Sequence, residues 1–385
     1  MKDERLYALD VTRGLAALAV VFSHWRHFFY VGGSLPEGVS SQSFPGYSWL
    51  WPLYDYGWIA VDYFFVVSGF VFFWLYVDVI RDRAISFGRF AWLRLSRLYP
   101  LHFATLILVL VLQWACLSRT GEYFVYQYND ALHFILNIFF ASHWGFQAGD
   151  SFNGPIWSVS VEVASYGAFF LVAFLIRGKI LRIVIPLMLS LAFNAAGFNP
   201  PLAKALLLFF VGGGVHLLVA RFPVRNQAAS LAWLAVAAIS WIVTIQFVSR
   251  GSWEAASNIL GFPSILSENT KYLSRVFTSF WLFPVTVYSV VGIDFAKLIS
   301  LRSVSWVGDI SYASYLTHFP LQLIAHLIMP VFGLGIAVFY TWQSLLIFYA
   351  ILIGLSLVVF TQFEKPAQTK MRDAFFAKGR LVRSV

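Results

Sequence analysis

Hydrophobic residues in this 385-residue chain fall into long runs that short polar segments separate. Most runs hold about 20 residues, the length that a helix needs to cross the hydrocarbon core of a membrane. A helix satisfies all its own backbone hydrogen bonds in lipid, which makes it the expected structure for such a run. The pattern predicts an all-α, polytopic membrane protein of about ten transmembrane helices: Leu6–Tyr30, Gly57–Val77, Arg97–Leu117, Ile156–Ile176, Ile180–Ala196, Leu202–Ala220, Ala228–Val248, Val276–Ile293, Ser311–Met329 and Phe339–Phe363.

One further run, Ala131–Ser142, is too short to span a membrane and predicts a short re-entrant or interfacial helix. The composition agrees with a membrane protein, because 59% of the residues are hydrophobic and only 12% are charged. Soluble proteins average about 25% charged residues. We therefore expect one membrane domain over residues 1–363, with its first helix retained as an anchor and not cleaved as a signal peptide.

The net charge of +9 does not indicate a nucleic-acid partner, because the basic residues follow the predicted topology. With ten spans and a cytoplasmic N-terminus, most of the 27 lysines and arginines face the cytoplasm, and both termini lie there. The far side holds only five, namely Arg119, Lys204, Arg250, Lys271 and Arg275. This positive-inside bias predicts a plasma-membrane protein, with a basic cytoplasmic tail over residues 364–385 that contacts membrane lipids.

An arginine and a histidine lie inside the first apolar run, at Arg13 and His24. Eleven helical steps make about three turns, so both side chains share one helix face, about 16 Å apart along the axis. Asp10 precedes Arg13 by three positions, which predicts an ion pair. Charged groups at membrane depth are costly and mark functional sites, so the pair is a candidate active site. The alternative is a polar seam that joins neighbouring helices.

The predicted spans place further polar residues at two depths. Asp62 and Glu162 share the outer layer of His24, where a carboxylate can hold the histidine tautomer and stabilise its protonated form. Mutual neutralisation of structural groups is the alternative for both carboxylates. Arg13 and His318 lie deeper, each about seven residues above the inner edge of its span. For His318, a hydrogen-bonded core histidine fits the sequence as well as a functional one.

Arg94 and Arg97 stand at the cytoplasmic mouth of the third span, three positions apart on a predicted helix. Their guanidinium groups would point the same way and could bind a phosphate in bidentate fashion. Any cytoplasmic loop collects arginines, which is the structural alternative. The functional interpretation is favoured because the pair extends a line that runs through Arg13 to His24. A long, thin anionic ligand would fit this line.

Several short motifs, in this order along the chain, resemble those of the acyltransferase type 3 family of membrane proteins. The resemblance runs from end to end and includes Asp10-Val-Thr-Arg13 with His24, Asp62 to Gly69, Arg94-Leu-Ser-Arg97, Pro155 to Glu162, Gly308 to Pro320 and Glu364-Lys-Pro366. Each motif alone is weak, but six in order within ten spans are specific. The resemblance implies a helical membrane O-acyltransferase that moves acyl groups, usually acetyl from cytoplasmic acetyl-CoA, to hydroxyls of bacterial envelope or secreted saccharides.

By the same resemblance, Arg13 and His24 correspond to the essential arginine and histidine of the family, and Arg94 and Arg97 to its proposed CoA-binding pair. Glu162 would orient His24, which acts as general base or as nucleophile. Asp10, Asp62 and His318 are expected to support the site. Some family members carry an added extracytoplasmic hydrolase-like domain, and none is expected here. A separate extracytoplasmic acyltransferase or polysaccharide export machinery is a candidate partner.

The acceptor, a saccharide or glycolipid, would enter from the far side. The long loops Val31–Tyr56, Ser118–Pro155 and Ser249–Arg275 are expected to form a platform with aromatic residues that stack on sugar rings or form an interfacial belt: Tyr47, Trp49, Trp51, Tyr54, Trp144 and Trp253. No metal site is predicted, since Cys116 is the single cysteine and no Cys or His spacing suits zinc. Two other functions stay open: a transporter or flippase of a lipid-linked or anionic substrate, and an inactive sensory or scaffold protein.

Overall fold

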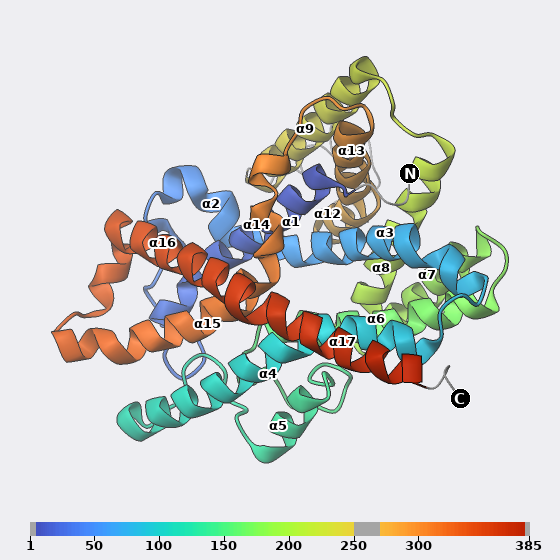
Figure 1. Cartoon of the computed structure of the whole chain (residues 1–385). Helices are drawn as coiled ribbons and strands as arrows, with labels where there is room; N and C mark the ends of the chain where they lie inside the picture. The colour runs from blue at the N-terminus through green and yellow to red at the C-terminus, as the bar shows by residue number, and fades with distance from the viewer. Residues whose placement is uncertain (1–4, 250–269, 382–385) are drawn as a thin grey trace.

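Helices form almost the whole of the computed structural model, which describes residues 5–249 and 270–381. No strand occurs in these ranges, so the all-α prediction is confirmed. Figure 1 shows the helices in chain order. Their bounds are α1 Tyr7–Ser23, α2 Tyr47–Tyr56, α3 Ala60–Arg81, α4 Phe87–Thr120, α5 Ala131–Ile138, α6 Ile156–Leu175, α7 Leu181–Ala195, α8 Pro200–Arg221, α9 Gln227–Ser249, α12 Thr270–Phe277, α13 Phe283–Phe295, α14 Trp306–Asp309, α15 Ser311–Ile328, α16 Trp342–Val358 and α17 Lys365–Leu381.

Eight helical stretches within the described residues are long and apolar enough to cross a membrane. The two other predicted spans are shorter helices. Helix α1 has 17 residues and continues as the 3-10 segment η1, His24–Phe29, whereas α7 has 15 residues. The helices thus match the predicted runs, but their lengths support eight spans and leave the count of ten unconfirmed.

Helix α3 lies at the centre of the bundle and packs against α1, α6 and α8. Its contact with α8 is very close, because glycines face backbone on both helices. A Cβ atom added to Gly69 would lie 1.8 Å from the carbonyl oxygen of Phe209, and one added to Gly212 would lie 2.0 Å from that of Val66. Small residues of this kind let membrane helices approach closely. The contact brings the backbones of α3 and α8 together.

The short helix α14 packs on α1 in the same way. A Cβ atom on Gly14 would lie 2.3 Å from the carbonyl oxygen of Val307, and one on Gly308 would lie 2.2 Å from that of Asp10. Helix α14 therefore lies directly beside residues 10–14 of α1. Since α15 begins three residues after Gly308, its first turn lies beside Arg13, and Ser311 and Arg13 line the same cavity.

Two segments predicted as a loop and a tail contain helices, and one predicted short helix is present. Helix α2 lies within the predicted loop Val31–Tyr56, and α5 confirms a short helix within Ala131–Ser142. Asp130 caps α5 by accepting a hydrogen bond from the backbone N–H of His133 at 2.9 Å, and this bond lowers the pKa of the Asp130 carboxyl. Helix α17 falls in the segment predicted as a basic tail.

Helix α17 continues α16 through the π-helical segment η8, Val359–Glu364, and packs against α4. Figure 1 shows α16 and α17 as one long rod that crosses α4. Trp92 Nε1 donates to the carbonyl oxygen of Met371 at 3.0 Å and its ring stacks on Phe375, while Arg372 Nε donates to Ser96 Oγ at 3.3 Å. This part of the tail was expected to lie on lipid, and instead it covers the start of α4, where Arg94 and Arg97 are found.

Candidate active site

A cavity of about 120 Å³ inside the bundle brings together four of the predicted site residues. Arg13 reaches it from α1, Arg94 and Arg97 from α4, and Glu162 from α6. The other lining residues come from α3, α4, α6 and α15: Val61, Phe64, Phe65, Val67, Ser68, Val71, Phe72, Leu98, Ser158, Val159, Tyr166, Ser311, Tyr312 and Tyr315. The lining residues include three permanently charged guanidinium groups and one carboxyl group, so the lining has an excess of positive charge and suits an anion.

Arg94 is held by aromatic side chains. Its Nη2 donates to Tyr76 Oη at 2.5 Å, and its guanidinium lies 5.2 Å from the ring centre of Phe72 and 4.9 Å from that of Tyr76. The Nε atom is buried and has no hydrogen-bond partner among the described residues. A buried donor without a partner is costly. The atom is therefore available to a ligand oxygen, which is what a phosphate site requires.

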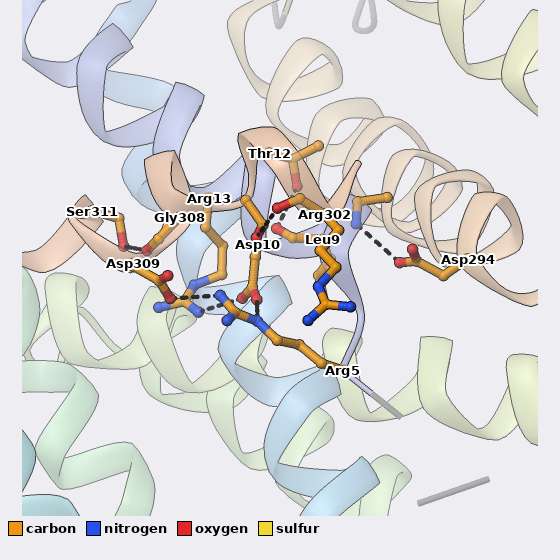
Figure 2. A network of polar contacts seen from close by, with 12 residues as sticks. Arg5, Leu9, Asp10, Thr12, Arg13, Asp294, Arg302, Gly308, Asp309 and Ser311 are labelled. Carbon is orange, nitrogen blue, oxygen red and sulfur yellow. Dashed lines mark hydrogen bonds and ion pairs between the residues drawn. The ribbon is translucent and has the colours of Figure 1, made fainter. Parts of the chain in front are cut away.

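Arg13 belongs to a network at the N-terminal end of α1, which Figure 2 shows. Arg13 Nη1 lies 3.3 Å from Asp10 Oδ1, so the predicted ion pair is confirmed. Arg5 approaches the other oxygen of Asp10 more closely, at 2.7 Å from its Nε, and its Nη2 lies 2.5 Å from Asp309 Oδ1. Asp10 is thus shared between two arginines and holds Arg5 more tightly. This leaves most donors of the Arg13 guanidinium for another anion.

Glu162 does not contact His24, contrary to the predicted cluster. Ser68 Oγ donates to Glu162 Oε1 at 2.5 Å, and Glu162 lies in the cavity of the three arginines. The carboxyl group therefore faces the anion site and not the imidazole.

His24 pairs with His318. The two rings stack with their centres 5.0 Å apart, and His24 Nδ1 lies 2.8 Å from His318 Nε2. His24 also stacks on His27, with ring centres 4.5 Å apart. Gln322 completes the group, because its Nε2 donates to the carbonyl oxygen of His24 at 2.9 Å and its Oε1 accepts from His27 Nδ1 at 3.1 Å. His24 is partly exposed, whereas His27 and His318 are buried.

The predicted depth of His318 is wrong for a physical reason. The hydropathy pattern placed it level with Arg13, since each lies about seven residues from the end of its span. Close packing of Gly308 on α1 starts α15 deeper in the bundle, so Ser311 and Tyr315 line the arginine cavity and His318 lies one turn beyond. His318 reaches His24 for this reason.

Asp62 is likewise not part of a histidine cluster. Its Oδ1 lies 2.8 Å from Nζ of Lys204 on α8, and both side chains line a second cavity of about 1250 Å³ on the other side of α3. His143 Nε2 lies 3.0 Å from Asp150 Oδ1 in the same cavity. The walls are mainly apolar and aromatic, with charged groups as ion pairs.

The aromatic residues proposed to form a sugar platform do not share one surface. Trp51 lines the large cavity, Trp49 is 85% exposed and Tyr54 is buried. Tyr47 Oη donates to Asp55, and Trp144 Nε1 to the carbonyl oxygen of Ser160. Trp253 and most of the loop Ser249–Arg275 lie outside the described residues.

Sequence reasoning missed four polar residues of these sites: Ser68, His27, Tyr315 and Gln322. Gln322 follows His318 by four positions and Tyr315 precedes it by three, so all three lie on one face of α15. His27 follows His24 by three positions. That spacing was visible in the sequence, but the residue against which each face packs was not.

No group of three or more histidine, cysteine or acidic residues suited to a metal ion occurs in the part of the chain that the structure describes. In the histidine group, His24 hydrogen-bonds to His318, His27 hydrogen-bonds to Gln322, and the rings of His24 and His27 stack.

Comparison with known proteins assigns the chain to a family by its sequence. The profile of the family described as an acyltransferase domain matches residues 6–361. A curated protein described as protein 2 in the picA locus of Rhizobium radiobacter is 34% identical over 106 residues. That alignment covers 28% of this chain and 44% of the relative, which is less than half of the relative's length. No solved structure matches.

Proposed function

Since the chain belongs to the acyltransferase-domain family, we propose that it is a membrane O-acyltransferase that moves an acetyl group from acetyl-CoA to a hydroxyl of an envelope or secreted saccharide. The observation that carries this proposal is the meeting of Arg13, Arg94 and Arg97 in one buried cavity. CoA is a thin polyanion with an acyl thioester at its far end. Such a donor needs cationic groups at the site of entry and a reactive group farther inside.

Arg94 and Arg97 bind phosphate oxygens of the donor at the entrance. Both lie near the start of α4, and Arg94 Nε is a buried donor that lacks a partner. Arg13 adds a third guanidinium deeper in the bundle, since Asp10 is engaged mainly by Arg5. A volume of about 120 Å³ is below the 300–1,000 Å³ of common ligand pockets, so the cavity widens when the donor binds.

His24 performs the proton transfer, about 16 Å along α1 from Arg13. A lone pair on its ring takes the proton of the acceptor hydroxyl as the hydroxyl oxygen bonds to the thioester carbonyl carbon. The carbon–sulfur bond breaks, and the leaving thiolate takes the proton from the imidazolium. An acyl-imidazole intermediate would use the same lone pair. Either route needs one ring nitrogen of His24 without hydrogen.

The donor enters from the cytoplasm and the acceptor from the opposite side of a bacterial plasma membrane, by this proposal. The basis is the charge bias of the sequence, with Arg81, Arg83 and Arg89 near the entrance and few cations at the other end of the helices. The second cavity, with Trp51 and Trp58 and the pair Asp62–Lys204, provides aromatic and charged groups of the kind that bind a saccharide or glycolipid.

The test is acyl transfer by the purified protein in lipid vesicles, with labelled acetyl-CoA as donor. His24→Ala should reduce acetyl transfer and acetyl-CoA turnover at least 100-fold, because general base catalysis contributes about 10²–10⁴-fold. Protein level and thermal stability in the membrane should stay within error. The matched control is His326→Ala, which removes a histidine of α15 whose ring centre lies 4.7 Å from that of Phe124.

Full activity of His24→Ala would remove this histidine from the chemistry. A wild-type protein that neither turns over nor binds acetyl-CoA, yet moves a lipid-linked saccharide across vesicles, would replace the acyltransferase proposal by the flippase alternative. The large apolar cavity is the feature that would serve such transport.

A further inference from the structure

We propose that His318 is a positioning residue that fixes which ring nitrogen of His24 can accept a proton. This inference rests on the proposed function of His24. It gives His318 the role that the sequence suggested for Glu162. The hydrogen-bond geometry carries it, because a chain of bonds runs from a backbone carbonyl through His318 to His24.

The chain begins at the carbonyl oxygen of Tyr315, which lies 2.7 Å from His318 Nδ1. A carbonyl oxygen can only accept, so His318 Nδ1 carries hydrogen and donates. His318 is fully buried, and none of the described carboxylates forms an ion pair with it. An unpaired charge inside the membrane is costly. We therefore take the ring as neutral, with its lone pair on Nε2.

The second bond follows from the first. His318 Nε2 lies 2.8 Å from His24 Nδ1, and two acceptors cannot form a hydrogen bond. Since His318 Nε2 has no hydrogen, His24 Nδ1 must donate. A neutral His24 with hydrogen on Nδ1 keeps its lone pair on Nε2. That nitrogen is the one that can take a hydroxyl proton or attack a thioester.

The neighbouring residues do not compete for His24 Nδ1. The Gln322 amide donates to the His24 carbonyl oxygen, which orients its oxygen toward His27 Nδ1. His27 therefore donates to Gln322 and contacts His24 only by stacking. Gln322 lies four positions after His318, so one face of α15 fixes both the backbone and the ring of His24. A protonated His24 keeps its Nδ1–H bond to His318, which stabilises the imidazolium during transfer.

The experiment compares three variants in the vesicle assay with acetyl-CoA. His318→Met fills similar space but offers no strong acceptor, so His24 Nδ1 loses its fixed hydrogen. We expect kcat to fall about 100-fold or more, with KM for acetyl-CoA changed less than about threefold, since wrong-tautomer defects act on the chemical step. His318→Gln offers an amide oxygen near the position of Nε2 and should restore kcat to within about tenfold of wild type.

His326→Met is the matched control, because it makes the same exchange two turns farther along α15. It should leave kcat and KM unchanged. Thermal unfolding of each variant checks that the bundle is intact. Equal loss of kcat in folded His318→Met and His318→Gln would overturn the proposal, since a space-filling role would then explain the residue. Full kcat in His318→Met while His24→Ala is inactive would also overturn it and leave the proposed function standing. An active His24→Ala would contradict both.

Discussion

Replacing Gly308 with alanine tests whether the contact between α14 and α1 sets the position of His318. The added Cβ would lie 2.2 Å from the carbonyl oxygen of Asp10, whereas ordinary contacts of such atoms begin at 3.4 Å. Helix α14 would have to move away by about 1 Å. Overpacking of this kind costs about 1–3 kcal/mol. The shift would pass directly into α15, which begins at Ser311.

The effect on function should exceed the effect on stability. A 1 Å displacement of α15 separates His318 from His24, and misplacement by about 1 Å lowers enzyme rates about 100-fold. The same movement draws Asp309 away from Arg5. We expect the unfolding temperature in detergent, followed by tryptophan fluorescence, to fall by a few degrees, and kcat for acetyl transfer to fall about 100-fold.

Gly354→Ala in α16 is the matched control, because nothing lies within 4 Å of its added Cβ. An alanine in an open helical position stabilises a protein by about 0.5–1 kcal/mol relative to glycine. Its unfolding temperature should stay level or rise, and kcat should not change. If Gly308→Ala matched Gly354→Ala in both measurements, close packing of α14 would not be what positions His318.

Two further predictions concern the donor site and the topology. The double variant Arg94→Gln, Arg97→Gln should raise KM for acetyl-CoA about 100-fold or more, since hydrogen bonds to charged groups contribute about 1.5–3 kcal/mol each. KM for the acceptor should change less. Equal effects on both KM values would argue against a phosphate site at these arginines. In a Cys116→Ala background, Ser40→Cys should react with a membrane-impermeant maleimide added to intact cells and Arg225→Cys should not; the reverse labelling would invert the proposed orientation.

Local patterns in the sequence predicted the features that depend on one helix. Apolar run length located the helices, because a helix in lipid must satisfy its own backbone, although α4 begins at Phe87 and not at the predicted Arg97. The spacing of Asp10 and Arg13 gave their ion pair, since i and i+3 side chains adjoin on any helix. Arg94 and Arg97 share one cavity for the same reason.

Contacts between helices were predicted poorly, because depth was inferred from the ends of apolar runs. The estimate assumed that each helix starts at the same membrane surface. The assumption fails for α15. Close packing at Gly14 and Gly308 places the start of α15 beside Arg13 and not beside the start of α1, so His318 reaches His24. Asp62 contacts Lys204 and Glu162 contacts Ser68. The rotation of each helix decides which face meets which neighbour, and the apolar pattern of a helix such as α3, which is hydrophobic on most sides, does not encode that rotation. The polar segment of α17 was predicted as a tail because it contains no apolar run. The helix packs on Trp92 through a tertiary contact that the apolar pattern does not show.

Tyr315 joins the two halves of the proposed site and bears on the shape of the donor that we propose. Its ring lines the arginine cavity, while its hydroxyl donates to the Pro155 carbonyl oxygen at 2.9 Å and lies 2.8 Å from Ser158 Oγ. Its own carbonyl oxygen binds His318, the partner of His24. The anion site and the histidine pair therefore meet at one residue of α15. If Arg94 and Arg97 bind the donor phosphates as proposed, the acyl end of the donor would have to pass Tyr315 to reach His24, and the pantetheine of CoA is slender enough for such a passage.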